Sequence, residues 1–341
     1  MSCNPKVSVI MPIYNAERYL ALSIGSIIEQ TFTDWELICV NDGSRDASGK
    51  LLHELAVSEP RLRLFEQENL GLVAALQNGI AQARGNLLAR MDADDIAMPE
   101  RFEKQVRYLN EHPEVAIVGG GAIEIDEDGD PLRLTSYPND HDQLVHRLLH
   151  RETALIHPSV MVRHEILRAT GGYRAKFQWI EDHDLWLRIS KLGKLANLPD
   201  IVIAYRQHAS SICWQRSNSQ RELMNQLLLE AYADRGLECP ARCIVESSKV
   251  RSKAGSGKWA RMAARGGYGH TAIKHLRKMW REKYPLGYKL RMTADSLVRL
   301  PGGMLRACVS DKSPALPKLH NWQNSSQSSC STNATLSRKS A

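Results

Sequence analysis

Long apolar runs are missing from this chain of 341 residues, in which 43% of the residues are hydrophobic and 24% are charged. The composition is that of a globular protein, and no stretch of about 18 apolar residues is present, so we predict no membrane-spanning helix. The first residues pass directly into an apolar strand pattern, without the basic segment, apolar core and cleavage site of a secretory signal. We therefore expect the protein to stay in the cytosol.

Several well-known binding motifs are also missing. The seven cysteines are an odd number and form no CxxC pair, which argues against zinc or redox chemistry and predicts reduced, structural thiols. No GxGxxG follows the first predicted strand, which argues against dinucleotide binding. Zinc-finger spacing, RNA-binding aromatic motifs and a recognisable helix-turn-helix are absent as well, so we expect no nucleic acid partner.

Acidic residues are scarce in the last hundred residues. Residues 241–341 contain 20 of the 45 Lys and Arg residues but only 4 of the 38 Asp and Glu residues. Such asymmetry indicates two functionally different parts, of which the basic one faces a polyanion: anionic lipid, nucleic acid or an acidic substrate. We expect a main domain over residues 1–240, a basic and mainly helical extension over 241–310, and a disordered polar tail over 311–341.

The first 120 residues alternate short β-rich runs with amphipathic helical stretches. Predicted strands include Val7–Met11, Trp35–Val40 and Leu87–Met91. This alternation predicts an α/β fold, with a mainly parallel sheet covered by helices. Ligands of such sheets bind beyond the carboxyl ends of the strands, so the residues that follow each strand are the first candidates for a functional site.

Three aspartates, Asp92, Asp94 and Asp95, follow the strand that ends at Met91. Carboxylates this close repel one another unless a positive charge compensates them. Mg²⁺ and Mn²⁺ prefer oxygen ligands and commonly bind through carboxylates together with substrate phosphates. The cluster therefore predicts a divalent cation site, although a solvated acidic loop that caps the following helix would have the same composition.

The first two strands also end in polar residues, Pro12-Ile-Tyr14-Asn15 and Asn41-Asp42-Gly43-Ser44. Asn, Asp, Gly and Ser are favoured in any tight turn. A carboxylate at a strand end can also accept hydrogen bonds from a nucleobase N–H or from ribose hydroxyls. Because all three polar turns follow strands, we favour the recognition role for Asp42.

A second acidic group opens a predicted helix at Glu181, with Asp182 and Asp184 in its first turn. First-turn acids complement the helix dipole. Three acids exceed what capping needs, and a carboxylate beside a sugar-binding cleft can act as a general base towards a hydroxyl group.

These residues resemble the inverting glycosyltransferase family 2, whose members have the GT-A fold. The likeness covers roughly residues 5–215, and each motif is weak alone but their order and spacing are specific. The matching segments are Val7–Asn15, Asn41–Ser44, Glu68-Asn69-Leu-Gly71, Asn78-Gly79, Met91–Asp95, Pro99-Glu-Arg101, Gly171-Gly172-Tyr173 and Glu181–Arg188.

The resemblance implies roles for individual residues. The donor nucleotide would contact Pro12, Tyr14, Asn15, Asp42, Asn69, Gly71 and Asp92. Asp94 would be the principal ligand of Mn²⁺ or Mg²⁺, and Asp182 would be the catalytic base. Arg206 or His208, from a segment that closes the site, would reach the diphosphate or the metal, and His208 is our second candidate metal ligand.

The fold implied by the resemblance is the Rossmann-like GT-A fold of nucleotide-diphospho-sugar transferases, a mixed sheet flanked by helices, here with a basic helical extension. The activity implied is metal-dependent, inverting transfer of a sugar from a nucleotide sugar, first of all a UDP-sugar, to a hydroxyl of a saccharide or lipid-linked acceptor. The setting would be the biosynthesis of a cell-surface polysaccharide or glycoconjugate. Alternatives are a metal-dependent nucleotidyltransferase, or a nucleic-acid-binding protein acting through its basic end.

A basic amphipathic helix is predicted near residue 275. Its apolar face would contain Ala272, Ile273, Leu276, Met279 and Trp280, and its basic face Lys274, Arg277, Lys278 and Arg281. One interpretation is peripheral attachment to the anionic inner face of the cell membrane. The other is an ordinary helix packed on the main domain.

Overall fold

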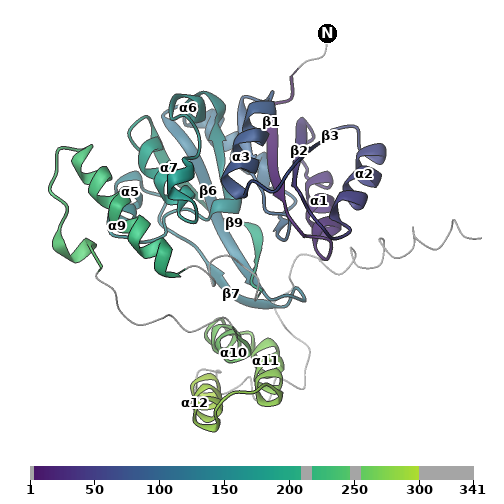
Figure 1. Cartoon of the computed structure of the whole chain (residues 1–341), viewed down its shortest axis with the longest axis vertical. Coiled ribbons are helices and arrows are strands. Elements are labelled where there is room, and N and C mark those ends of the chain that lie inside the picture. The colour runs from purple at the N-terminus through teal and green to yellow at the C-terminus, as the bar shows by residue number, and fades with distance from the viewer. Residues whose placement is uncertain (1–3, 209–216, 246–254, 299–341) are drawn as a thin grey trace, which may run out of the picture.

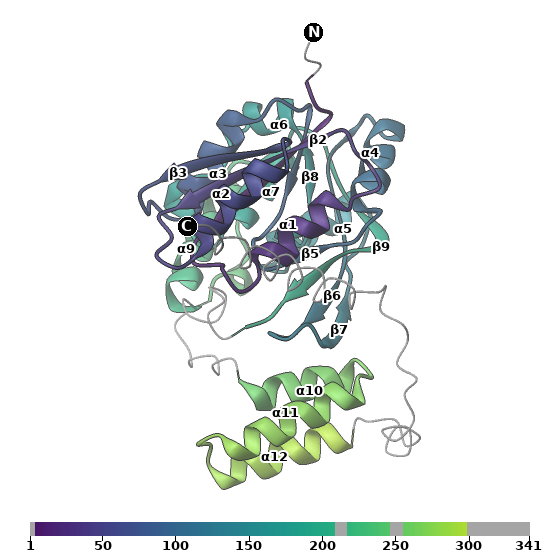
Figure 2. The same cartoon turned by 90° about the vertical axis from the view of Figure 1, so that its right-hand side faces the viewer.

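The computed structural model describes residues 4–208, 217–245 and 255–298 (Figures 1 and 2). The predicted tail over 311–341 lies outside the described residues. The strands are β1 Val7–Ile13, β2 Trp35–Asp42, β3 Leu62–Gln67, β4 Leu87–Arg90, β5 Ile96–Ala97, β6 Val115–Ile125, β7 Pro131–Thr135, β8 Met161–Arg163 and β9 Lys194–Arg206. The helices of the main domain are α1 Leu20–Ile28, α2 Ser48–Ser58, α3 Leu72–Gln82, α4 Arg101–Glu111, α5 His141–Leu149, α6 His164–Ala169, α7 Glu181–Ile189 and α9 Ser217–Ala233.

The strands form one mixed sheet in the order β3-β2-β1-β4-β8-β6-β9-β5, and β7 pairs with β6. The first four strands of this order are parallel, whereas β8 lies antiparallel between β4 and β6. The long strands β6 and β9 are parallel to each other. The carboxyl ends of β1, β2 and β4 therefore lie at one edge of the sheet, as the sequence predicts.

Helices cover both faces of this sheet, which explains why β1 and β2 are buried along their whole length. Side chains alternate along β1, so that Met11 packs in a cluster with α1, α2 and α4, and Ile10 in a second cluster with α3, α5 and α7. The predicted α/β fold is confirmed.

The second strand is longer than predicted, because it ends at Asp42 instead of Val40. Its last residues pair with β3, with Asn41 opposite Glu66 and Asp42 opposite Gln67. Polar residues do not suggest a strand by themselves, and this pairing partner is what extends it.

Three further helices, α10 Ser256–Arg265, α11 Gly269–Arg281 and α12 Leu286–Leu297, form a separate layer beside β7 (Figures 1 and 2). The predicted amphipathic helix is α11. Its residues Ala272, Leu276 and Met279 are buried in clusters with residues of α10, α12 and β7, whereas Trp280 stays 43% exposed. Most of the predicted apolar face is therefore covered by protein.

Within the described residues, every helix is too short or too polar to cross a bilayer.

Candidate active site

The loops that follow β1 and β2 are joined by hydrogen bonds through Asn15. Its backbone N–H donates to Ser44 Oγ at 3.0 Å, and its Oδ1 accepts from the Arg45 N–H at 2.8 Å. Asn15 has a φ of 50°, a left-handed conformation that Asn tolerates better than most residues. Pro12 is buried in β1, whereas Tyr14 is 47% exposed and can contact a ligand. The structure brings these predicted residues to one rim of the sheet.

The carboxylate of Asp42 shapes the neighbouring turn at Asn69–Gly71. Its Oδ1 accepts from Gln67 Nε2 at 2.7 Å and from the Leu70 N–H at 2.8 Å, and its Oδ2 accepts from the Gly71 N–H at 2.9 Å. Gly71 has a φ of 89°, which a glycine adopts without strain. A carboxylate offers about four acceptor directions, so about one remains for a bound ligand. Sequence reasoning did not foresee that Asp42 is already used in this way.

The three aspartates that follow β4 converge as predicted, with ligand oxygens that lie within 4.8 Å of one another. Asp94 Oδ2 is 2.7 Å from His208 Nε2, so the two candidate metal ligands are in contact. Asp95 is fully buried, and its Oδ1 accepts from the Arg206 N–H while its Oδ2 has no hydrogen-bond partner among the described residues. Burial raises the pKa of Asp95 well above its usual range.

Arg206 holds the loop of Asp94 and Asp95 in place through hydrogen bonds. Its Nε donates to the carbonyl oxygen of Asp94 at 2.7 Å, and its Nη1 donates to the carbonyl oxygen of Asp126 at 3.1 Å. Only 3% of Arg206 is exposed. Two nitrogens of the Arg206 guanidinium group are thus occupied by backbone carbonyls, so of the two residues predicted to reach the diphosphate or the metal, His208 is the one we favour.

Arg90 connects the aspartates to the second acidic group. It ends β4, is 6% exposed and forms an ion pair with Asp92. Burial raises the pKa of Asp92 although the Arg90 charge opposes this. The hydroxyl of Tyr173 lies 2.7 Å from His157 Nε2. Burial raises the pKa of Tyr173, and the charge of Arg90 lowers it. The charges of Asp182 and Asp92 raise this pKa as well.

Asp92 and Asp182, ninety residues apart in sequence, therefore act on the same tyrosine. Sequence reasoning missed Arg90, although a lone arginine at the end of the apolar run Leu87-Leu-Ala is a signal that could have drawn attention.

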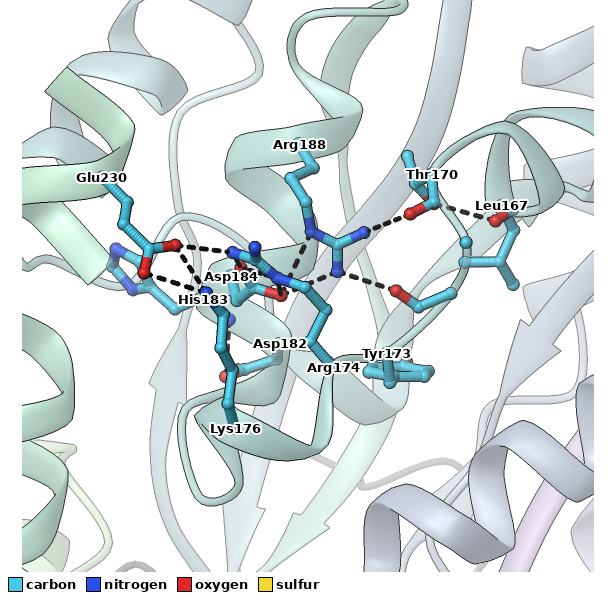
Figure 3. A network of polar contacts seen from close by, with 12 residues as sticks. Leu167, Thr170, Tyr173, Arg174, Lys176, Asp182, His183, Asp184, Arg188 and Glu230 are labelled. Carbon is cyan, nitrogen blue, oxygen red and sulfur yellow. Dashed lines mark hydrogen bonds and ion pairs between the residues drawn. The ribbon is translucent and has the colours of Figure 1, made fainter. Parts of the chain in front are cut away.

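The three acids of the first turn of α7 have different surroundings. Asp182 is partly exposed, while Glu181 is 5% exposed and its Oε2 has no hydrogen-bond partner among the described residues. Burial and the nearby charge of Asp182 raise the pKa of Glu181 to about 7. Asp184 is fully buried between Arg174 and Arg188, at 3.0 Å from Arg174 Nε and 2.7 Å from Arg188 Nη2 (Figure 3).

Of the three acids at the beginning of α7, Asp184 is thus not available for catalysis, because it is paired with two arginines. Arg188 also donates to the carbonyl oxygens of Thr170 and Gly172, both at 2.7 Å (Figure 3). Asp184 therefore fixes the turn that carries Tyr173, and Glu181 and Asp182 are the acids left beside the site.

The overall fold is shared with a protein of known structure. The crystal structure of Staphylococcus aureus TarS 1–349 is similar with a TM-score of 0.55 at 17% sequence identity, over 87% of this chain and 81% of that chain. The mixed sheet and its flanking helices thus form the GT-A fold.

The family follows from the sequence comparisons. Residues 8–171 match the model of glycosyl transferase family 2. The amylovoran biosynthesis glycosyltransferase AmsE of Erwinia amylovora is 36% identical over 203 residues, which are 58% of this chain and 75% of AmsE. The O-antigen biosynthesis glycosyltransferase WbnJ of Escherichia coli is 32% identical over 209 residues, 60% of this chain and 81% of WbnJ.

The chain belongs to glycosyl transferase family 2. This finding confirms the predicted family, the GT-A fold and the glycosyltransferase activity, and it favours them over the nucleotidyltransferase alternative. The roles of the individual site residues stay predictions.

Proposed function

We propose that this glycosyltransferase transfers a sugar, with inversion at the anomeric carbon, from a nucleoside diphosphate to an acceptor hydroxyl in a metal-dependent reaction. The observation that supports the proposal is the cluster of Asp92, Asp94 and Asp95 beside Arg90, with the charges of both Asp92 and Asp182 acting on Tyr173. A UDP-sugar is the first donor to test, since TarS, which has a similar fold, has been crystallised with UDP-GlcNAc.

Asp94 and His208 suit a divalent cation, Mn²⁺ or Mg²⁺. Their ligand atoms lie 2.7 Å apart, and adjacent ligands of an octahedral ion with bonds of about 2.1 Å are about 3 Å apart. The carboxyl of Asp95 lies within the same cluster and has an unused oxygen. Such a cation would neutralise charge on the departing diphosphate.

The nucleoside is expected at the rim formed by the β1 and β2 loops. Tyr14 offers an exposed ring, and the remaining acceptor direction of Asp42 can take a hydrogen bond from a base N–H. The turn at Asn69–Gly71 packs close to the loop before α7, because a Cβ on Gly71 would lie 3.1 Å from Gln178 Nε2. A donor at this rim would therefore have its sugar next to α7.

Asp182 is the residue we propose as the general base. It is partly exposed, so an acceptor hydroxyl can approach its carboxylate, whereas Asp184 is enclosed by two arginines. Removal of the acceptor proton as the oxygen attacks the anomeric carbon gives inversion in a single displacement. No covalent enzyme intermediate is needed.

The test is the Asp182→Asn variant. Transfer should fall by roughly 10²–10⁴-fold, while the affinity for the UDP-sugar changes less than about twofold, because the base acts on the acceptor. Transfer is measured by release of nucleoside diphosphate in the presence of acceptor, and affinity by calorimetry. Asp234→Asn, at an exposed position after α9, is the matched control and should retain full activity. Substantial turnover by Asp182→Asn would rule out the base assignment.

A further inference from the structure

The outward side of α12 carries an apolar stripe. Leu286, Leu290 and Leu297 are 63%, 55% and 40% exposed, and Ala294 is exposed as well. Positions i, i+4, i+8 and i+11 lie on one side of a helix. The opposite side packs inward, where Met292 belongs to a cluster with α10 and α11. Within the described part of the chain, α12 thus has a second apolar face with no protein against it.

Trp280, the penultimate residue of α11, extends this stripe. Its ring is 43% exposed, and its Nε1 donates to Thr293 Oγ1 of α12 at 3.0 Å. The Lys289 ammonium group lies 5.7 Å from the ring centroid. An indole anchored in this way keeps an apolar body at the surface next to its polar contacts, the arrangement that tryptophan adopts at membrane interfaces.

The surroundings of the stripe are positively charged. Lys283, three residues before Leu286, and Arg291, next to Leu290, are exposed and form no ion pair among the described residues. The two acidic residues of this helical layer are used locally, since Glu282 accepts from Ser256 Oγ at 2.7 Å and Asp295 lies 3.4 Å from Arg261 Nη1. Leucines, a tryptophan and unpaired cations therefore share one exposed region, which we call the α12 face.

The α12 face belongs to a layer that is fastened next to the active site. Lys274 and His275 of α11 contact Asp126, whose carbonyl oxygen accepts from Arg206, which in turn holds Asp94. In both views α12 lies farther from the sheet than α10 (Figures 1 and 2). The helix α12 is thus on the outer side of the layer, while α11 is joined to Asp126 and through it to Arg206.

We propose that the α12 face docks on an anionic lipid surface. Leucines and tryptophan enter the interface between headgroups and acyl chains, and the surrounding cations attract anionic headgroups. The cations favour a negatively charged partner. The exposed leucines favour a partner with an apolar interior, which a lipid bilayer has and a nucleic acid lacks.

The test uses the full-length chain and sedimentation with two kinds of vesicle, phosphatidylcholine alone and phosphatidylcholine with phosphatidylserine. The wild type should bind the anionic vesicles at least tenfold more tightly, and added salt should weaken this binding. Leu286→Ser together with Leu290→Ser should weaken it at least tenfold. The matched control is Leu134→Ser together with Leu229→Ser, whose leucines are 61% and 54% exposed on β7 and α9, and its binding should not change.

Several results would overturn the proposal. These are equal binding to both vesicle types, unchanged binding of the Leu286→Ser and Leu290→Ser variant, or no vesicle binding combined with a change in oligomeric state of that variant. The last result would assign the face to a second copy of the chain. Donor binding is measured in parallel on the same variants. A variant that loses vesicle binding but keeps UDP-sugar binding tests the α12 face alone. If the wild type does not bind a UDP-sugar, the proposed function is contradicted, and the result says nothing about the α12 face.

Discussion

Burial decides which of the acids at the beginning of α7 can take part in chemistry. Asp184 has lost all contact with solvent and is neutralised by two arginines, so it cannot reach an acceptor. Asp182, two residues earlier, is partly exposed. Their order in the sequence does not distinguish them, because the arginines that enclose Asp184 come from two different segments.

The raised pKa of Glu181 predicts how the stability of the protein depends on pH. Its pKa is raised from an ordinary value of 4.5 to about 7, first by burial and then by the charge of Asp182. A carboxyl whose folded-state pKa is raised binds its proton more tightly in the folded protein, so stability falls as pH rises between these two values. The loss is at most about 3 kcal/mol.

The Glu181→Gln variant should therefore be more stable than the wild type at about pH 8, and this advantage should disappear at about pH 5. Urea unfolding at both pH values measures the difference in free energy of unfolding. Glu54→Gln, at an exposed position of α2, should show no such pH-dependent gain. An equal effect of Glu181→Gln at both pH values would contradict the raised pKa.

At the residue scale, sequence could place the candidate site but not the state of its groups. Tyr14, Asp42 and Asp94 could be placed because they follow strands of a recognisable α/β pattern. The hydrogen bonds that occupy Asp42, the enclosure of Arg206 and the partnership of Arg90 with Asp92 could not, because each depends on contacts between distant segments.

At the scale of elements, the loop between β6 and β7 joins the helical layer to the sheet. The Lys274 ammonium group lies 2.7, 2.9 and 2.6 Å from carboxylate oxygens of Asp126, Asp128 and Asp130. Asp126 is fully buried and also accepts from His275 at 2.8 Å, if that ring nitrogen carries the proton. Burial raises the pKa of Asp126, but hydrogen bonds from His275 and Lys274 outweigh it and hold the pKa well below its usual range.

Lys274→Met should destabilise the protein by roughly 3–5 kcal/mol, because it removes the lysine charge from a buried carboxylate that then keeps only its hydrogen bonds from His275 and the backbone. Lys283→Met removes an exposed lysine that forms no ion pair among the described residues, and should change stability by less than about 0.5 kcal/mol. Urea unfolding of both variants compares the two losses. Similar losses would mean that this contact does not hold the layer.

Some elements follow from sequence periodicity and others do not. The strands and helices of the first 110 residues repeat apolar positions clearly, and the structure has them at nearly the expected places. The stretch from Gly121 to Glu152 is weakly patterned, and there β6 continues into a hairpin with β7. The apolar face of α11 can be recognised from the sequence. Its packing partners cannot, because they belong to α10 and α12, which precede and follow α11 in the chain.

At the scale of the whole molecule, donor and metal should stabilise the fold together. At about 100 times the dissociation constant, a ligand of the folded state adds about 2.7 kcal/mol to its stability. For a domain of this size that corresponds to a rise in Tm of roughly 5–10 °C. We expect this rise with a UDP-sugar and Mn²⁺, and a much smaller one when a chelator is present.

Thermal unfolding measures both values, and Asp94→Asn should behave with Mn²⁺ as the wild type does with the chelator. A rise that is the same with and without the chelator would contradict metal-assisted donor binding.

The ammonium group of Lys274 lies among three aspartates of the β6–β7 loop. In other proteins, a divalent cation taken up from solution neutralises such a cluster of carboxylates. The counter-charge of Lys274 is covalently part of the chain, so it can be neither diluted out nor extracted. A chelating agent added to the purified enzyme should thus leave the hairpin intact. Any activity that it abolishes, and that added Mn²⁺ restores, can then be attributed to the strand-end aspartates rather than to a loosened scaffold.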